Sequence, residues 1–247
     1  RTAMVVEKIV EELDKNEARQ FLILSDRKQQ LEDFNRLLKE AGVESVGYYV
    51  GGMKQKDLKK LLAYSSLAHV GLIAAGTYTL TLDGLRGAVL QMIAHGFVVV
   101  GLFYAAEIIF RRYETRAIAE MGGIRSQSPK FTSMFLILVL ASVALPTTFN
   151  FIGEFTVLYS LSQINIWFAI LGGTTIILGA YYMLKMFQHA MLGETNSKPF
   201  ADVTVNEGIT LVLIIGVLFF FGMYPKPITD LITPSLEEIL TQINRIN

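Results

Sequence analysis

Residues 61–80 read LLAYSSLAHVGLIAAGTYTL, a run without Asp, Glu, Lys or Arg. Four lysines precede it within residues 54–60. A helix of about 20 apolar residues spans the roughly 30 Å hydrocarbon core of a bilayer. We therefore predict that a transmembrane domain begins here and that its first helix occupies residues 61–80.

Charge is distributed unevenly on the two sides of this boundary. Residues 1–60 contain 12 Lys/Arg and 11 Asp/Glu, whereas residues 61–247 contain only 10 and 11, although the net charge of the chain is +0. Soluble domains usually carry about 25% charged residues. The contrast predicts a soluble segment joined to a membrane domain. The chain begins with Arg1 rather than Met, so we expect a fragment of a longer protein.

The soluble segment has the pattern of a small α/β fragment. Residues 2–14 and 28–41 carry apolar side chains at helical spacing, and residues 21–25 and 46–50 are short apolar runs typical of strands. The order helix, strand, helix, strand is half of a parallel α/β sheet. We predict that this fragment covers residues 1–58 and that the membrane domain covers residues 59–247.

Four more apolar segments follow the first helix. The third is too long for one straight span and contains Pro146, Asn150 and Glu154. Pro146 removes a helical hydrogen bond and Gly153 adjoins the acid, so we predict a broken helix in this segment. The predicted fold class is mainly α, with about five transmembrane helices, one discontinuous, after a small α/β fragment. The predicted spans are 61–80, 87–110, 131–162, 164–192 and 209–224.

Basic residues predict the orientation of these spans. Lys and Arg concentrate in short cytoplasmic loops of membrane proteins. In this chain they gather in residues 54–60, in residues 111–130 and around residues 185–198. Because the five spans cross the membrane in alternating directions, all three regions lie on the same side of the membrane. We therefore expect these loops in the cytoplasm and the C-terminus outside.

Glu154 is the first candidate for chemistry. A carboxylate at membrane depth costs roughly 2.5–3.5 kcal/mol on insertion scales, so such residues are typical of transport pathways. The low dielectric disfavours the charged form, which lets the group bind or release a proton near neutrality. The alternative interpretation is a glutamate paired with a lysine for packing alone.

His69 and His95 lie near the middle of consecutive predicted spans. Histidine titrates near neutral pH and can relay protons. Either residue can instead be a neutral hydrogen-bond partner. His95 is the better relay candidate because Ala94 and Gly96 leave space beside it for water or a neighbouring helix.

Other charged residues in the spans have weaker claims. Lys185 is a further candidate relay residue, although its long side chain can equally extend to the membrane surface. Glu107 precedes Arg111 by four residues, the spacing of a structural ion pair within a helix.

Several classes of function are excluded or disfavoured. The chain has no cysteine, which excludes disulfides, iron–sulfur clusters and thiolate zinc sites. It contains neither a phosphate-binding GxxxxGK[ST] loop nor an HExxH metal motif, and its three histidines are scattered. We expect no cofactor, no metal and no redox site. Residues 1–60 are charge-balanced rather than basic, so no nucleic-acid partner is expected.

Four motifs together resemble the M/4-type antiporter-like subunit of respiratory complex I, a family related to multi-subunit cation/proton antiporters. They are KDLKKLLAYSSLAHVG (56–71), GAVLQMIAHG (87–96), ALPTTFNFIGEF (144–155) and GMYPKPI (222–228). The resemblance implies a fold of fourteen helices with two inverted five-helix repeats, each with a broken helix. The spans of this chain are then similar to the last five.

The resemblance also implies roles for the candidate residues. Glu154 matches the acidic residue of the second broken helix, on the proton exit route. His95 matches a histidine of the hydrophilic axis, and His69 matches the histidine one span earlier. The first repeat, its glutamate and the two central lysines of the family are absent from this chain, so we expect an incomplete pump.

The implied function is the C-terminal part of a proton-translocating, non-redox subunit of NADH:quinone oxidoreductase. Implied partners are the other membrane subunits of complex I and the lipid bilayer, in a bacterial inner membrane. The alternative is a membrane scaffold that packs against partners without transport.

Residues 21–58 resemble a different family, the start of the second motor domain of superfamily-two helicases of viruses and phages. The phosphate loop, acidic box and arginine finger of that family are missing, which excludes ATP-driven unwinding. The two resemblances meet within residues 54–60. We therefore hypothesise a chimaera joined there, with a natural fusion as the alternative and a nucleic-acid-associated fragment as a third interpretation.

Overall fold

The structure is a computed structural model that describes residues 36–38, 40–41, 57–193 and 198–246. The α/β fragment predicted for residues 1–58, and with it the helicase-like segment, lies almost entirely outside these described residues. The helices described below belong to the second of two compact units, residues 55–247.

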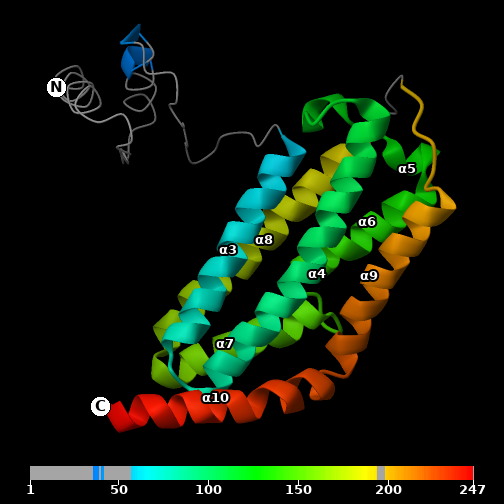
Figure 1. Cartoon of the computed structure of the whole chain (residues 1–247). Helices are drawn as coiled ribbons and strands as arrows, with labels where there is room; N and C mark the ends of the chain where they lie inside the picture. The colour runs from blue at the N-terminus through cyan, green and yellow to red at the C-terminus, as the bar shows by residue number, and fades with distance from the viewer. Residues whose placement is uncertain (1–35, 39, 42–56, 194–197, 247) are drawn as a thin grey trace. The chain divides into compact units, whose positions relative to one another are not determined.

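The described part of this unit is mainly α-helical (Figure 1). Four of its helices are long and apolar enough to cross a membrane: α3 (Leu58–Tyr78), α4 (Leu82–Tyr113), α8 (Ile166–Met191) and α9 (Val205–Met223). The remaining elements are η1 (Ile118–Glu120), α5 (Ile124–Gln127), α6 (Pro129–Ser142), α7 (Phe149–Ile164) and α10 (Lys226–Ile246). Within the described ranges, the β-type pairing is a single bridge between Asp57 and Ala117.

The long helices match four of the five predicted spans, and the third predicted span is divided. Residues 131–162 fall on α6 and α7, which are separated by a non-helical segment at residues 143–148. Pro146 lies in this segment, where its missing N–H cannot interrupt a helix. Gly153, which we assigned to the break, lies instead inside α7. The break does not depend on the flexibility of a glycine, because Ala144 and Thr147 take the positive φ values of the turn, 56° and 83°.

Side-chain caps explain where the long helices begin. Asp57 accepts a hydrogen bond from the backbone N–H of Lys60 at the start of α3. Thr81 does the same for Gly84 at the start of α4. Thr204 and Glu207 form a reciprocal capping box at the start of α9, so that both exposed N–H groups are satisfied.

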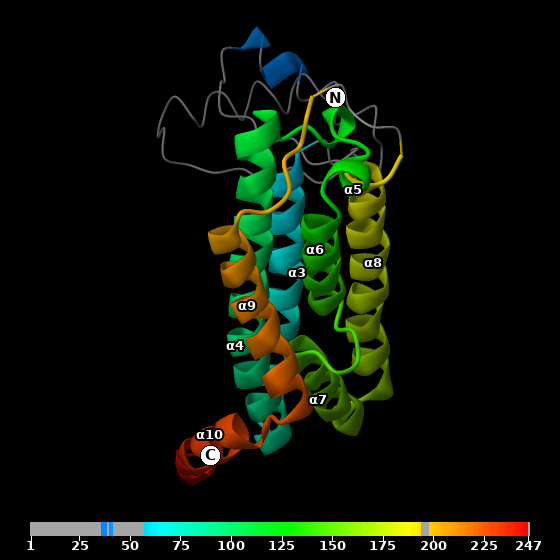
Figure 2. The ribbon, with the colours of Figure 1, turned by 90° about the vertical axis from the view of Figure 1, so that its right-hand side faces the viewer.

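The two half-length helices occupy the interior of the bundle. Figures 1 and 2 show α3, α4, α8 and α9 running along its length, with α6 and α7 following one another between them and α10 crossing one end. α7 contacts α3, α4, α8 and α9. The outer face of α8 exposes large apolar residues such as Trp167, Leu171 and Ile177, as expected for a lipid-facing surface. Three polar residues of α7, Asn150, Glu154 and Ser160, are buried in the protein interior.

The break is packed directly against the end of α9. A Cβ atom on Gly222 would overlap the carbonyl oxygen of Thr147 and lie 2.8 Å from the backbone nitrogen of Phe149. Glycine at position 222 thus lets the backbone of α9 approach the backbone of the break. This contact holds the break, and with it the start of α7, against the end of α9.

Candidate functional site

Glu154 lies one turn into α7 and its side chain is 1% exposed. Its Oε1 atom accepts a hydrogen bond of 2.9 Å from Nε2 of Gln91, which comes from α4. The same oxygen lies 2.8 Å from Nδ1 of His69, which comes from α3. Three helices therefore meet at one carboxylate oxygen.

His95 lies next to this contact. Its Nε2 atom is 2.7 Å from Oγ of Ser66 on α3. The His69 and His95 rings are tilted by 42° and their centroids are 5.1 Å apart. Each imidazole therefore has a polar partner on another helix: His69 contacts Glu154 on α7, and His95 contacts Ser66 on α3.

Regular helical spacing creates this cluster. Gln91 and His95 are four residues apart on α4, Asn150 and Glu154 are four apart on α7, and Ser66 precedes His69 by three on α3. Residues at these spacings lie on the same helix face. We call the six residues Ser66, His69, Gln91, His95, Asn150 and Glu154 the polar cluster.

Gly153 brings α7 close to α4 beside the polar cluster. A Cβ atom on Gly153 would lie 2.7 Å from both the backbone nitrogen and Cα of Gln91. A larger residue would separate the two helices. The absence of a side chain at Gly153 lets the two helices come close enough for the Gln91–Glu154 hydrogen bond. Gly153 therefore has a packing role, in place of the helix-breaking role that we predicted.

The polar cluster can accept, hold and pass on a proton. When the proton is on His69, the contact with Glu154 is an ion pair; when it is on Glu154, both groups are neutral. A buried pair of this kind exchanges a proton without creating an unpaired charge in the apolar interior.

The structure brings Glu154, His69 and His95 together, but not Lys185. The Lys185 ammonium is exposed on α8 and donates to the Tyr181 hydroxyl at 3.2 Å. Glu107 pairs with Arg111 at 3.2 Å and with Lys59 at 2.8 Å, in line with the structural interpretation of its charge.

Sequence reasoning missed Gln91 and Ser66. The sequence did indicate both residues, since each is a polar residue in an apolar span and lies one helical turn before a histidine. It also missed Ser65, which accepts a 2.9 Å hydrogen bond from Tyr182 and extends the polar contacts toward α8. The helical period alone does not tell which polar residues face each other across helices.

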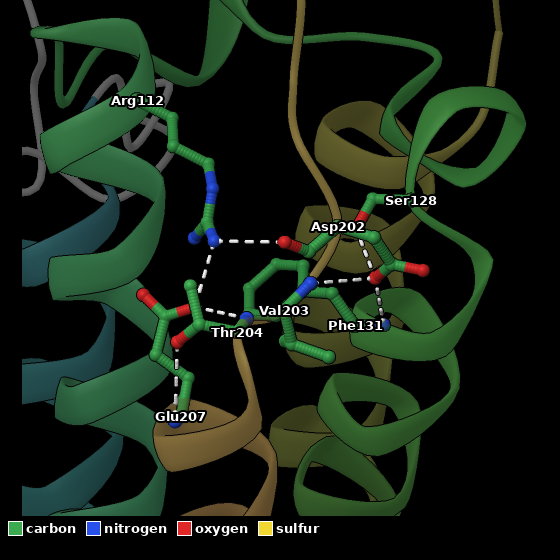
Figure 3. A network of polar contacts seen from close by, with 7 residues as sticks. All are labelled: Arg112, Ser128, Phe131, Asp202, Val203, Thr204 and Glu207. Carbon is green, nitrogen blue, oxygen red and sulfur yellow. Dashed lines mark hydrogen bonds and ion pairs between the residues drawn. The ribbon is translucent and has the colours of Figure 1, made fainter.

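A second polar network joins the loop before α9 to α4 and α6 (Figure 3). Arg112 lies 2.7 Å from a carboxylate oxygen of Glu207 and donates to the backbone carbonyl of Asp202 at 3.2 Å. Asp202 Oδ1 accepts hydrogen bonds from Ser128 Oγ at 2.7 Å and from the Phe131 backbone N–H at 3.1 Å. Asp202 thus caps the start of α6 from another part of the chain.

The ionised form of Asp202 is favoured in this network. Burial disfavours the charge, but hydrogen bonds from Ser128 and from the backbone N–H groups of Val203, Phe131 and Lys130 outweigh it and hold the pKa of Asp202 below its usual value. The network thereby holds the start of α6 in place at this end of the bundle.

Residues 57–193 and 198–246 contain no group of three or more His, Asp or Glu residues placed to hold a metal ion.

Comparisons with known proteins agree with this arrangement. Residues 47–179 match the family model described as NADH:quinone oxidoreductase/Mrp antiporter, TM. NADH-quinone oxidoreductase subunit M of Rickettsia typhi is 38% identical over 191 residues, which are 76% of this chain and 39% of that protein. Subunit M of Mycobacterium tuberculosis is 34% identical over 193 residues and is covered over 35% of its length.

Solved structures show the same helical arrangement. A chain of respiratory complex I from Thermus thermophilus superposes with a TM-score of 0.72 at 31% identity, covering 75% of this chain and 40% of that one. A chain of the Mrp complex from a Dietzia species superposes with a TM-score of 0.68 at 15% identity, covering 84% and 50%, and shows the fold alone.

This chain therefore spans less than half the length of the curated relatives cited, about 39% of the Rickettsia protein. None of these comparisons supports the helicase resemblance of residues 21–58. The matched segment contains α3, α4, the helix break and all six residues of the polar cluster. The chain belongs to the NADH:quinone oxidoreductase/Mrp antiporter transmembrane family.

Proposed function

We propose that residues 57–246 are the C-terminal part of a proton-translocating antiporter-like subunit of NADH:quinone oxidoreductase. In this proposal Glu154, His69 and His95 carry protons through the membrane interior. The observation that carries it is the 2.8 Å contact between His69 and a fully buried Glu154, placed just after a break in the helix. Ionisable residues at such positions are typical of proton pathways.

The proposed topology has five membrane crossings. α6 and α7 contain 14 and 16 residues, so each is too short to cross alone, whereas together they have the length of one discontinuous span. The end of α4, the start of α6 and the start of α3 carry the basic residues that we assign to the cytoplasmic side of a bacterial inner membrane. α10 and the C-terminus then lie outside.

The proposed mechanism uses the two states of the His69–Glu154 pair. A proton that moves from His69 Nδ1 to Glu154 Oε1 converts an ion pair into two neutral groups. Gln91 donates to the same oxygen and keeps it in place during this exchange. A charge that approaches from a neighbouring part of the assembly shifts the balance between the two states and drives release of the proton.

The whole pump requires residues outside this chain. The aligned part of this chain covers 39% of the Rickettsia relative, and the resemblance assigns a first repeat and two central lysines to the remainder. We propose that the other membrane subunits of complex I are the partners of the chain. Residues 57–246 then supply the release half of the pathway.

The test is replacement of Glu154 by Gln in the respiratory assembly reconstituted into liposomes. Gln keeps the shape and the hydrogen bond from Gln91 but cannot carry a proton. We expect proton translocation per NADH oxidised to fall, with transfer through this site slowed by about 10²–10⁴-fold. The matched control is Glu107→Gln, because Glu107 lies on α4 outside the polar cluster.

The scaffold alternative makes the opposite prediction. If Glu154→Gln leaves translocation undiminished while the assembly stays intact, these helices only pack against partners. Equal losses in Glu154→Gln and Glu107→Gln would also contradict the proposal, since the effect would then follow from general disruption of the bundle.

A further inference from the structure

The outer face of α8 carries a continuous stripe of exposed residues whose chemistry changes along the helix. Figure 2 shows α8 at one edge of the bundle. The exposed residues recur every three or four positions, so they lie on one side of the helix. They are Ile177, Leu178, Tyr181, Leu184, Lys185, Gln188 and His189, which we call the α8 stripe. The stripe is apolar toward the middle of α8 and becomes polar and basic toward its end.

Hydrogen bonds connect the polar part of the α8 stripe. Lys185 Nζ donates to the Tyr181 hydroxyl at 3.2 Å and lies 5.4 Å from the centre of the Tyr181 ring. His189 Nδ1 lies 2.7 Å from the backbone carbonyl oxygen of Lys185 and donates to it. This leaves Nε2 of His189 for another partner. Three polar side chains on successive turns thus form one exposed group.

The charge of Lys185 has no counter-charge among the described residues. There the ammonium has the neutral Tyr181 hydroxyl as its hydrogen-bond partner and forms no ion pair. Lys59 and Arg112, in contrast, lie 2.8 Å and 2.7 Å from carboxylate oxygens. A cation on a membrane-spanning helix is costly unless it pairs with an anion or reaches the membrane surface. Lys185 therefore calls for an anion that the described chain does not supply.

The position of Lys185 along α8 places it close to the headgroup layer. The 26 residues of α8 extend over about 39 Å, whereas the hydrocarbon core is roughly 30 Å thick. An upright α8 therefore protrudes by about 4–5 Å at each end. Lys185 lies about 9 Å before the last residue, Met191, which is about one turn inside the hydrocarbon. A lysine side chain is long enough to reach the headgroups from this depth.

A hollow opens beside the basic end of the α8 stripe. Its volume is about 420 Å³, and it is lined by Met121, Gly122, Gln188, His189, Leu192 and Gly193. Sites for small molecules measure roughly 300–1,000 Å³. Because Gln188 and His189 belong to the stripe, the hollow provides space for a polar headgroup next to the cation.

The apolar part of the stripe suits lipid chains better than another helix. Helices that pack closely in membranes present small residues to each other, so that their backbones can approach. The side chains next to Lys185 are large instead: Ile177, Leu178 and Leu184 are 71%, 61% and 41% exposed. Flexible hydrocarbon chains can fit the surface between such side chains.

We propose that the α8 stripe binds an anionic phospholipid. Lys185 Nζ and the Tyr181 hydroxyl donate to oxygens of the phosphate, and His189 Nε2 does so in its protonated form. The acyl chains lie along Ile177 and Leu178. Basic residues at the end of a membrane helix attract anionic lipids in this way. The inference goes beyond the proposed function, since it requires only that α8 crosses a membrane.

Native mass spectrometry of the full chain in detergent tests the proposal. The protein is titrated with phosphatidylglycerol, which is anionic, or with phosphatidylethanolamine, which is zwitterionic, both with the same acyl chains. The variants are Lys185→Gln, Lys185→Met as a second neutral variant, Lys185→Arg and Tyr181→Phe. The matched control is Lys60→Gln, because Lys60 is an exposed lysine at the start of another helix, α3. The thermal unfolding midpoint of each variant shows whether it is folded.

We expect the wild type to bind phosphatidylglycerol more tightly than phosphatidylethanolamine. Lys185→Gln and Lys185→Met weaken phosphatidylglycerol binding about fivefold, as expected for the loss of one basic residue at a membrane surface. They leave phosphatidylethanolamine binding unchanged. Lys185→Arg retains the preference because it keeps the charge, Tyr181→Phe weakens it less, and Lys60→Gln has no effect.

Three results of this titration overturn the proposal. They are equal affinities of the wild type for the two lipids, undiminished phosphatidylglycerol binding in both neutral Lys185 variants, and an equal loss in Lys60→Gln. A protein partner is tested by carbodiimide cross-linking of the intact respiratory assembly, which joins an ammonium to an adjacent carboxylate. A cross-link from Lys185 to another membrane subunit overturns the lipid proposal in favour of that partner.

The lipid site and the proton pathway can fail separately. Glu154→Gln should bind phosphatidylglycerol as the wild type does, because Glu154 is buried on α7 and does not belong to the α8 stripe. Undiminished proton translocation in Glu154→Gln would remove the proposed function and leave the lipid site intact. Loss of the lipid preference in Glu154→Gln would show that binding does not depend on the stripe alone, and would contradict the assignment.

Discussion

Replacing Gly153 with alanine tests the close approach of α7 to α4 on which the polar cluster depends. The added Cβ would lie 2.6 Å from Oε1 of Gln91 and 2.7 Å from its backbone nitrogen and Cα, whereas ordinary contacts begin at 3.4 Å. The Gln91 amide can rotate away, but its backbone cannot. The helices must therefore separate by about 0.7 Å at this level.

This separation has a calculable cost. Overpacking of a well-packed interior costs about 1–3 kcal/mol. The better helix propensity of alanine offsets roughly 1 kcal/mol of this. The Gln91–Glu154 hydrogen bond, now 2.9 Å, stretches beyond good geometry and contributes about another 1 kcal/mol to the loss. We expect a net destabilisation of about 1–3 kcal/mol.

The assay is thermal unfolding of the full chain in detergent, followed by circular dichroism. For a chain of this size about 1 kcal/mol corresponds to a shift of roughly 2–4 °C, so Gly153→Ala is expected to lower the midpoint by about 2–12 °C. The control is Gly96→Ala on α4, because a Cβ there meets no atom within 4 Å. Its midpoint should stay unchanged or rise.

Equal midpoints for Gly153→Ala and Gly96→Ala would refute the reasoning, since the two glycines differ in what surrounds them and not in backbone conformation. A destabilised Gly153→Ala protein that transports protons at the normal rate would refute a narrower claim. The contact would then support the fold, and the Gln91–Glu154 hydrogen bond would not matter for proton transfer.

Further predictions concern the relay, the break and the Asp202 network. His69→Gln retains a hydrogen-bonding group beside Glu154 but cannot carry a proton, so proton transfer in liposomes should fall at least about tenfold with little change in the unfolding midpoint. Gly222→Ala should displace the break at Thr147 and lower the unfolding midpoint, whereas Gly216→Ala, in open space on the same helix, should not. Because the pKa of Asp202 is lower in the folded state, its stabilising contribution is complete above the unfolded value of about 3.9 and is lost as pH falls through the folded value. Asp202→Ala should therefore be less stable than the wild type at neutral pH, with a difference that shrinks in acid; a pH-independent difference would show that the charge of Asp202 contributes nothing. Arg112→Met should destabilise the bundle by about 1–3 kcal/mol, and a double-mutant cycle with Glu207→Gln should show coupling, because the two side chains form an ion pair of 2.7 Å.

The sequence by itself was sufficient to predict the apolar helices and the candidate acid, but not α10, which follows the last predicted span. The length of an apolar run is set by the thickness of the hydrocarbon core, so the matches of α3, α4, α8 and α9 to predicted spans follow from composition alone. Pro146 indicated the break because proline has no N–H to donate. Glu154 stood out because a carboxylate in an apolar run is costly to insert.

Only the tertiary structure decided which of these residues meet. His69, Gln91 and Glu154 come from three helices, and the register between those helices depends on how their surfaces pack rather than on the spacing within any one of them. The role of Gly153 changed from breaking a helix to allowing close packing, because the sequence does not say what lies opposite a glycine. Lys185, like His69, is an ionisable residue within an apolar span of the sequence, yet it lies on the outer face of the bundle. A helix presents successive residues to different neighbours, so the sequence alone does not show which of them face inward. Composition therefore determines that a polar residue lies in the apolar layer, and packing between helices determines which partner it has there.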